Sequence, residues 1–117
     1  MRIYLAGPMR GISFFNWSMF DKVSAALRAE GHEVFSPADE DRKLGIVPNE
    51  KGDEGILPEG ITRRTIFSAD TQYICNHADT IALLPGWEKS SGVRAEHALA
   101  LTLGHTIMIL GANYVGV

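Results

Sequence analysis

Cysteine is almost absent from this sequence, since Cys75 is the only one among 117 residues. A single cysteine excludes an internal disulfide framework and any metal cluster that needs several thiolates. We therefore expect a reduced compartment and interpret Cys75 as a small buried residue of its helix. Four histidines show no spacing typical of metal ligands, so no metal site is expected: His32, His77, His97 and His105.

An excess of one charge is also lacking, because 11 basic and 14 acidic residues give a formal net charge of −3. This balance excludes the basic surface that binds duplex nucleic acid. A single phosphate bound by a local loop stays compatible with it, because such a site needs no overall positive charge. We therefore expect a small-molecule partner and no nucleic acid.

Long apolar runs are missing as well. The first apolar run, within MRIYLAGPM, stops at Gly7-Pro8 and is too short for the core of a signal peptide or for a membrane span. The protein is therefore expected to be soluble and cytoplasmic, without a membrane partner. The length and the 45% hydrophobic content fit one compact domain, residues 1–117.

Strands and helices are expected to alternate along the chain. Short apolar runs predict strands at residues 2–6, 32–36, 79–84 and 106–110. Helical spacing of apolar residues predicts one helix from an N-cap at Ser13 to Gly31, one over residues 61–77, and one through Ala95 and Leu103 to Gly104. Residues 38–60 have no apolar period and predict a long surface loop, which is either a lid or specificity element or a disordered stretch.

This alternation predicts an α/β protein whose parallel sheet is covered by helices on both faces. Ligands bind to such doubly wound sheets at the carboxyl ends of the strands, near the point where the strand order reverses. Three loops leave these ends, at residues 7–11, 36–39 and 85–92. Their side chains are expected to converge on one site.

The first loop is Gly7-Pro8-Met9-Arg10-Gly11. Its two glycines allow the backbone to approach an anion, and Arg10 offers a planar set of donors. The alternative is a tight turn with a solvated arginine. The loop lacks both the Gly-Lys-Ser/Thr ending of a Walker loop and the GxGxxG spacing of dinucleotide folds, which disfavours ATP and NAD as ligands.

The third loop leads to a glutamate just inside a helix. Ser90, Ser91 and Gly92 can cap this helix, bind an anion, or do both. Glu96 can reach a ligand in the crevice, and the helix dipole is expected to keep its carboxylate ionised. A solvated first-turn glutamate is the alternative. Trp87 in the same loop stacks on a base or shapes the loop.

A glutamate and a second carboxyl group together are typical of glycosidic bond cleavage. Asp70 and Asp79 are the candidates for the second group. Asp79 opens a strand at its amino end and is interpreted as structural. Asp70 reaches the crevice only if its helix leans over it.

Several motifs together resemble the nucleoside 2-deoxyribosyltransferase superfamily. They are Tyr4-Leu-Ala-Gly7-Pro8, the run ADTIALLPGWEKSSG with a preceding aspartate, and Ser91-Gly92-x-x-x-Glu96. The chain is most similar to small phage and bacterial deoxyribosyltransferase-like proteins, over nearly its whole length except residues 38–60. The resemblance implies a single-domain flavodoxin-like or Rossmann-like three-layer sandwich with four or five parallel strands. It also implies cleavage of an N-glycosidic bond without a cofactor.

The resemblance also implies roles for individual residues. Glu96 corresponds to the nucleophile at C1′, Tyr4 to the tyrosine beside it, and Asp70 to the aspartate that handles the base. The first loop is similar to the Gly-x-x-Arg-Gly of deoxynucleoside 5′-monophosphate N-hydrolases, which favours a nucleotide substrate and water as the acceptor. The residues expected to bind that substrate are Gly7, Pro8, Met9, Arg10, Gly11, Trp87, Ser90, Ser91 and Gly92.

Two alternatives stay open: a deoxyribosyltransferase that exchanges bases, and a nucleotide sensor without turnover. Relatives of this superfamily form dimers or higher symmetric assemblies, so a homodimer or larger homo-oligomer is expected. Ala98 and Leu101 add apolar residues to further faces of the last helix, which fits burial against a partner. Asn113-Tyr114 is a candidate segment for donation across that interface.

Overall fold

Four parallel strands form the central sheet of the computed structural model, which describes residues 1–53 and 55–111. They are β1 (Arg2–Ala6), β2 (Glu33–Phe35), β5 (Thr80–Leu83) and β6 (Thr106–Ile109), in the order β2-β1-β5-β6. The chain leaves β1 toward β2 and later returns to place β5 on the other side of β1. The strand order therefore reverses between β1 and β5, which is where a ligand is expected.

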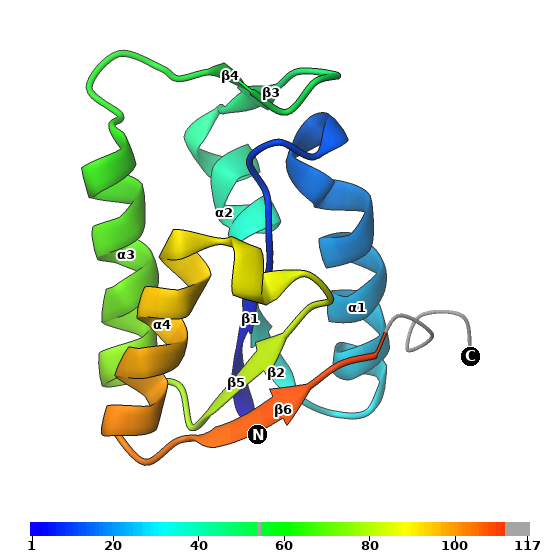
Figure 1. Ribbon diagram of the computed structural model, residues 1–117, viewed down its shortest axis with the longest axis vertical. Helices are drawn as coiled ribbons and strands as arrows, with labels where there is room; N and C mark the ends of the chain where they lie inside the picture. The colour runs from blue at the N-terminus through cyan, green and yellow to red at the C-terminus, as the bar shows by residue number, and fades with distance from the viewer. Residues whose placement is uncertain (54, 112–117) are drawn as a thin grey trace.

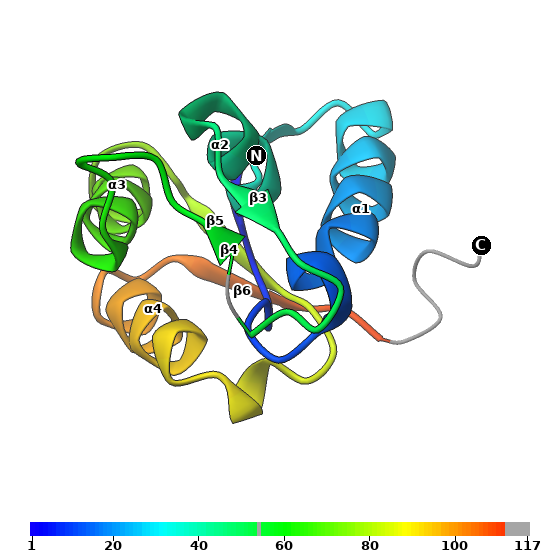
Figure 2. The same cartoon turned by 90° about the horizontal axis from the view of Figure 1, so that it is seen from above.

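Helices cover both faces of this sheet, which confirms the prediction of a Rossmann-like α/β sandwich (Figures 1 and 2). On one face lie α1 (Trp17–Ala29) and α2 (Pro37–Leu44), and on the other lie α3 (Arg63–Asn76) and α4 (Ser91–Thr102). The strands and the helices α1, α3 and α4 start and end within a few residues of their predicted positions.

Alternation along β1 decides which side chains reach the site. Ile3 and Leu5 pack into the core on the side of α1, whereas Tyr4 and Ala6 pack into the core on the side of α3 and α4. All four are at most 1% exposed. The hydroxyl group of Tyr4 is thereby buried under the two helices that carry Asp70 and Glu96.

The prediction of a surface loop over residues 38–60 is wrong. This segment contains most of α2 and a small antiparallel hairpin of β3 (Val47–Pro48) and β4 (Gly55–Ile56). Helix α2 has the expected end signals: a proline in its first turn, acidic residues near its start, basic residues near its end and a left-handed glycine after it. With eight residues, of which only Pro37, Ala38 and Asp41 are buried, α2 is too short to show an apolar period.

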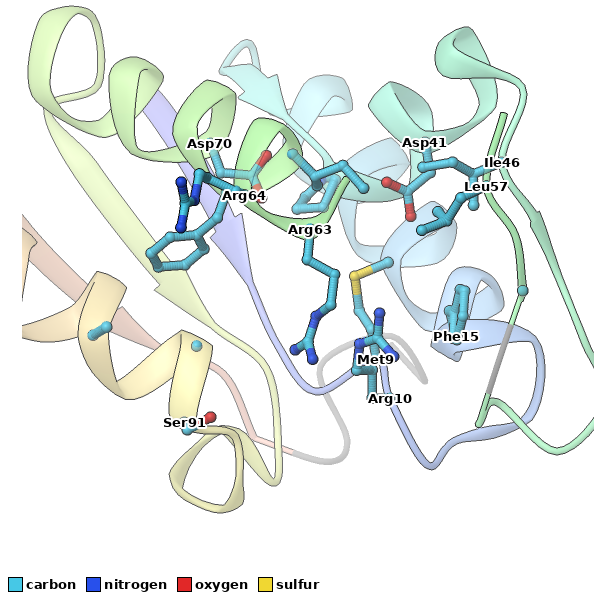
Figure 3. A pocket seen from close by; sticks show the side chains of 16 residues that line it. Met9, Arg10, Phe15, Asp41, Ile46, Leu57, Arg63, Arg64, Asp70 and Ser91 are labelled. Carbon is cyan, nitrogen blue, oxygen red and sulfur yellow. The ribbon is translucent and has the colours of Figure 1, made fainter. Parts of the chain in front are cut away.

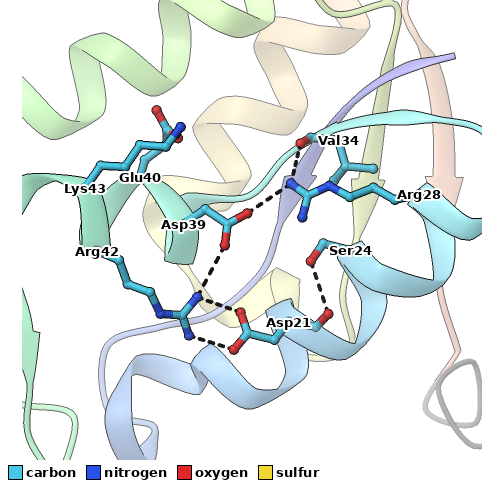
Figure 4. Close-up of polar contacts among 8 residues, drawn as sticks. All are labelled: Asp21, Ser24, Arg28, Val34, Asp39, Glu40, Arg42 and Lys43. Atoms are coloured by element: carbon cyan, nitrogen blue, oxygen red, sulfur yellow. Dashed lines mark hydrogen bonds and ion pairs between the residues drawn. The ribbon is translucent and has the colours of Figure 1, made fainter.

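Ion pairs join α2 to α1 (Figure 4). Arg42 donates to both carboxylate oxygens of Asp21, at 2.8 and 2.6 Å, and to Asp39 at 3.3 Å. Arg28 of α1 donates to Asp39 at 2.9 Å and to the carbonyl of Val34 at 2.8 Å. The position of α2 is thus set by charged contacts as well as by its short buried face.

The segment before α1 differs from the prediction. A 3₁₀ turn, Ser13–Asn16, precedes the helix, and Phe14, Phe15 and Asn16 have left-handed φ angles of 51°, 54° and 62°. Ser13 is therefore not the N-cap of α1. The reason lies in contacts with the hairpin, because the amide of Phe14 donates to the carbonyl of Asn49 at 2.9 Å.

A second backbone bond ties these two segments together. The amide of Gly11 donates to the carbonyl of Gly52 at 2.8 Å. Gly52 itself has a φ of +70°, and a side chain there would collide with the carbonyl of Ile12. Close approach of the two segments therefore requires glycine at position 52.

Two smaller predictions concern Cys75 and the segment Asn113-Tyr114. Cys75 is exposed and not buried, because the neighbouring Ile74 occupies the core-facing position of α3. Asn113-Tyr114 lies outside the described residues. Within the described ranges, no helix is long and apolar enough to cross a membrane.

Candidate active site

Tyr4 and Glu96 form a buried hydrogen bond at the centre of the candidate site. The Tyr4 hydroxyl donates to Oε2 of Glu96 at 2.6 Å, and the two residues are 1% and 5% exposed. β1 places the tyrosine, and the start of α4 places the glutamate. That start is fixed by Ser90, whose side chain accepts from the amide of Val93 at 3.3 Å.

Asp70 of α3 joins this pair. It is 8% exposed, and its carboxyl group interacts with the Tyr4 hydroxyl. Burial raises the pKa of Asp70 to about 7, with a further rise from the charge of Asp41 and an opposing effect of Tyr4. Helix α3 therefore does lean over the crevice, and the structure brings Tyr4, Asp70 and Glu96 together.

The expectation that the helix dipole keeps Glu96 ionised is wrong. Burial raises the pKa of Glu96 to about 8, the neighbouring Asp70 raises it further, and the hydrogen bond from Tyr4 only partly opposes them. Glu96 is the sixth residue of α4, beyond the first turn where the dipole acts. The two carboxyl groups consequently retain about one proton between them near neutral pH.

A pocket of about 810 Å³ opens beside these carboxyl groups (Figure 3). Its walls come from the loop after β1, from α2, from the hairpin and from the first turns of α3 and α4. Asp70 lines the pocket, as do Met9, Arg10, Ser91 and Gly92. Glu96 and Tyr4 are not among the residues that line it, but Glu96 directly follows the lining residue Ala95 in α4 and interacts with Asp70.

Three arginines surround the pocket, and two of them were not anticipated. Arg63 and Arg64 begin α3, and both line the pocket together with Arg10. Burial and the nearby Arg63 lower the pKa of Arg10, whereas Asp41 opposes this shift. No salt bridge joins any of the three to a carboxylate in the described part of the chain.

The position of Arg63 and Arg64 is informative because cations are disfavoured at a helix N-terminus. Helix stability therefore does not account for two arginines there. The pair Arg-Arg directly after the capping residue Thr62 was the available sequence signal. Arg10 and Arg63, which extend into the same part of the pocket in Figure 3, make that part suitable for a phosphate or carboxylate.

Several residues expected to bind substrate have other contacts. Gly7 packs against the end of β5, where a Cβ atom would lie 2.6 Å from Leu84 Cδ1. The carbonyl of Pro8 accepts from Asn16 Nδ2 at 3.0 Å. The amide of Gly11 is used by the hairpin, as described above, so it is not available to an anion.

In the third loop, too, only some of the residues expected to bind substrate line the pocket. Ser91 and Gly92 line the pocket, whereas Ser90 caps α4. Trp87 packs on the core, with its ring centroid 4.7 Å from that of His97. Capping was one of the roles considered for Ser90, and shaping the loop was one of those considered for Trp87.

Asp79 has the structural role expected for it. Its two carboxylate oxygens each accept from the amide of Arg2 at 3.1 Å, and Oδ1 also accepts from the Thr80 hydroxyl at 2.8 Å. These contacts lie at the amino ends of β1 and β5. Asp79 is therefore at the opposite edge of the sheet from Asp70.

Comparison with known proteins gives one family. Residues 1–109 match the family model DUF4406, which is described as a domain of unknown function. The match spans every strand and helix from β1 to β6. No curated protein matches the chain.

Proposed function

The chain belongs to the DUF4406 family, and we propose that it hydrolyses the N-glycosidic bond of a nucleoside 5′-monophosphate. The observation that carries this proposal is the buried hydrogen bond of 2.6 Å between Tyr4 and Glu96, with Asp70 beside it on the pocket wall. Two carboxyl groups with raised pKa values, one tyrosine and an arginine-rich pocket suit this reaction.

The two carboxyl groups divide the chemistry between them. As the C1′–N bond breaks, its electron pair goes to the base nitrogen, which takes a proton from Asp70. The Glu96 carboxylate stabilises the cationic sugar or bonds to C1′. Water then attacks C1′ and gives a proton to Asp70. Where a C1′–Glu96 bond has formed, it breaks and its electron pair returns to the carboxylate, which releases the sugar phosphate.

The proton that this reaction needs is already in the site. Burial raises the pKa of Glu96 to about 8 and that of Asp70 to about 7, so the pair retains a proton near neutral pH. Positive charge that develops at C1′ favours the ionised form of Glu96 and shifts the proton toward Asp70. Tyr4 contacts both carboxyl groups and keeps them within reach of each other.

The arginines and the start of α4 would hold the 5′-phosphate. Arg10 and Arg63 extend into the same part of the pocket in Figure 3. Ser91 and Gly92 add the N-terminus of a 12-residue helix, which favours an anion.

Base release from a panel of ribo- and deoxyribonucleoside monophosphates, followed by chromatography, tests the proposal. We expect release by the wild type and by Glu59→Ala, which removes an exposed glutamate outside the pocket. Glu96→Ala should release none. Release that is equal in wild type and Glu96→Ala, or absent with every nucleotide, would refute the hydrolase.

Further measurements in the same assay distinguish the proposed hydrolase from related activities. Arg10→Ala and Arg63→Ala should reduce kcat/KM for monophosphates much more than for free nucleosides, and equal losses on both would exclude the phosphate site. Addition of a second free base should give no new nucleotide, whereas base exchange would identify a transferase. Saturable binding without release would identify a sensor.

We also propose that the protein acts as a homo-oligomer. Leu101 of α4 is 55% exposed and Leu103 after it is 44% exposed, although both are large apolar residues. Light scattering on the purified protein should show at least a dimer. A monomer at micromolar concentration would contradict this.

A further inference from the structure

Asp41 is a buried carboxyl group of the pocket that the reaction above does not use. It lies on α2 and is 6% exposed, and it lines the same pocket as Asp70. Figure 3 shows its carboxylate turned into the pocket, on the opposite side from Ser91. A buried carboxyl group aimed into a ligand pocket calls for a donor.

The protein does not supply that donor within the described residues. The indole N–H of Trp17 is near enough to lower the pKa of Asp41, yet it misses hydrogen-bond geometry and has no partner of its own. Arg42 is occupied by Asp21 and Asp39. The charge of Arg10 lowers the pKa of Asp41, but Arg10 forms no ion pair with it. Burial accordingly raises the pKa of Asp41 to about 6.

The surroundings of Asp41 suit a flat heterocycle. Phe15, Ile46 and Leu57 line the pocket close to Asp41 and give this end apolar walls (Figure 3). A nucleobase packs its faces on apolar side chains and presents N–H and C=O groups at its edge. The carboxylate of Asp41 would offer such an edge an acceptor.

We infer that Asp41 accepts hydrogen bonds from the base and selects bases that carry an exocyclic amine. This inference rests on the proposed function and adds the substrate class. The amine of cytosine, adenine or guanine would donate to the carboxylate. The carbonyl oxygen that replaces it in uracil, hypoxanthine or xanthine would face the carboxylate, so that two acceptors oppose each other at this position.

Three substrate pairs that exchange the amine for a carbonyl, and with it the adjacent ring nitrogen for an N–H group, test the inference. We expect wild-type kcat/KM to favour the amine over the carbonyl in at least one of the monophosphate pairs cytosine/uracil, adenine/hypoxanthine and guanine/xanthine, by about 10- to 100-fold, the effect of one unsatisfied buried polar group. Equal rates within every pair, or a preference for the carbonyl, would overturn it. This measurement needs no variant.

Asp41→Asn asks whether Asp41 causes the preference. An amide offers both a donor and an acceptor, so the ratio within the preferred pair should fall to about threefold or less, because either base edge then finds a partner. Glu59→Gln makes the same charge change at an exposed residue outside the pocket and should keep the wild-type ratio. An equal loss on both members of the pair would mean that Asp41 only positions Arg10, and would overturn the inference.

Binding separates this inference from the proposed function. Calorimetry with Glu96→Gln measures affinity for the same pairs in the absence of turnover. If no nucleotide is hydrolysed by the wild type, the hydrolase fails. An affinity preference for the amine that disappears when Asp41→Asn is added would still support the role of Asp41. Equal or undetectable affinities would refute it.

Discussion

Glu96→Gln is expected to shift the stability of the folded protein in a pH-dependent way. Glu96 is buried, and its pKa is raised from 4.5 to about 8 in the folded state. The folded state therefore binds more protons than the unfolded state between these values, and the wild type loses stability as pH rises through that range. Glutamine does not titrate in this range, so the free energy of unfolding of the variant lacks this contribution.

The expected size follows from the width of the interval. Each pH unit within it changes the free energy of unfolding by about 1.36 kcal/mol. Between pH 5 and pH 7.5 the stability of Glu96→Gln relative to wild type should therefore rise by about 3 kcal/mol. The neighbouring carboxyl groups are present in both proteins and largely cancel in the comparison.

Urea unfolding at the two pH values measures this difference. Glu59→Gln, which replaces an exposed glutamate, serves as the control and should follow the wild type at both pH values. A relative stability of Glu96→Gln that stays constant within about 0.5 kcal/mol, the usual range for surface substitutions, would refute the reasoning. It would mean that Glu96 is ionised in the folded protein.

Three further predictions concern the same site and its scaffold. The pH profile of kcat/KM should be bell-shaped with limbs near 7 and 8, because the reaction needs one of Asp70 and Glu96 protonated and the other ionised. Asp70→Asn should abolish the bell and lower the pKa of Glu96. Tyr4→Phe should reduce the rate of base release by about 10- to 100-fold, because it removes a charge-assisted hydrogen bond. Gly7→Ala should destabilise the fold by about 1–3 kcal/mol in thermal or urea unfolding, since the new Cβ would overlap Leu84.

Each of these has an outcome that contradicts it. A rate that stays flat from pH 6 to pH 9 would exclude the shared proton. A Tyr4→Phe variant with wild-type activity would show that the buried hydrogen bond is not used. Gly111→Ala places a Cβ atom in open space and is the control for Gly7→Ala, so equal stability of these two variants would refute the packing argument.

The sheet and the position of the carboxyl groups were predictable because they follow from local patterns. Continuous apolar runs predicted β1 and β5, and the change from strand to small-residue loop to helix placed Glu96 at the strand ends. The pairing of Tyr4 with Glu96 joins residues 92 positions apart, and only the resemblance to a known superfamily indicated it. Spacing alone left Asp70 conditional on the tilt of α3.

Other parts of the site depend on tertiary structure. Helix α2 was missed because its end signals were read as features of a loop, and with it Asp41 was missed. The left-handed residues Phe14 and Phe15 have no sequence signal, since contacts with the hairpin hold them there. The protonation of Glu96 was mispredicted because burial, which a sequence does not report, outweighs the helix dipole.

The two backbone bonds that join residues 11–14 to residues 49–52 have a consequence for how this site can change. These bonds make the far wall of the pocket a pair of short segments that support each other, whereas Tyr4, Asp70 and Glu96 are anchored in the sheet and its helices. Exchange of the hairpin for one of another length would therefore change the wall where we propose that the base binds, and leave the carboxyl groups in place. The fold would thus allow the substrate to change while the residues proposed for the reaction are kept.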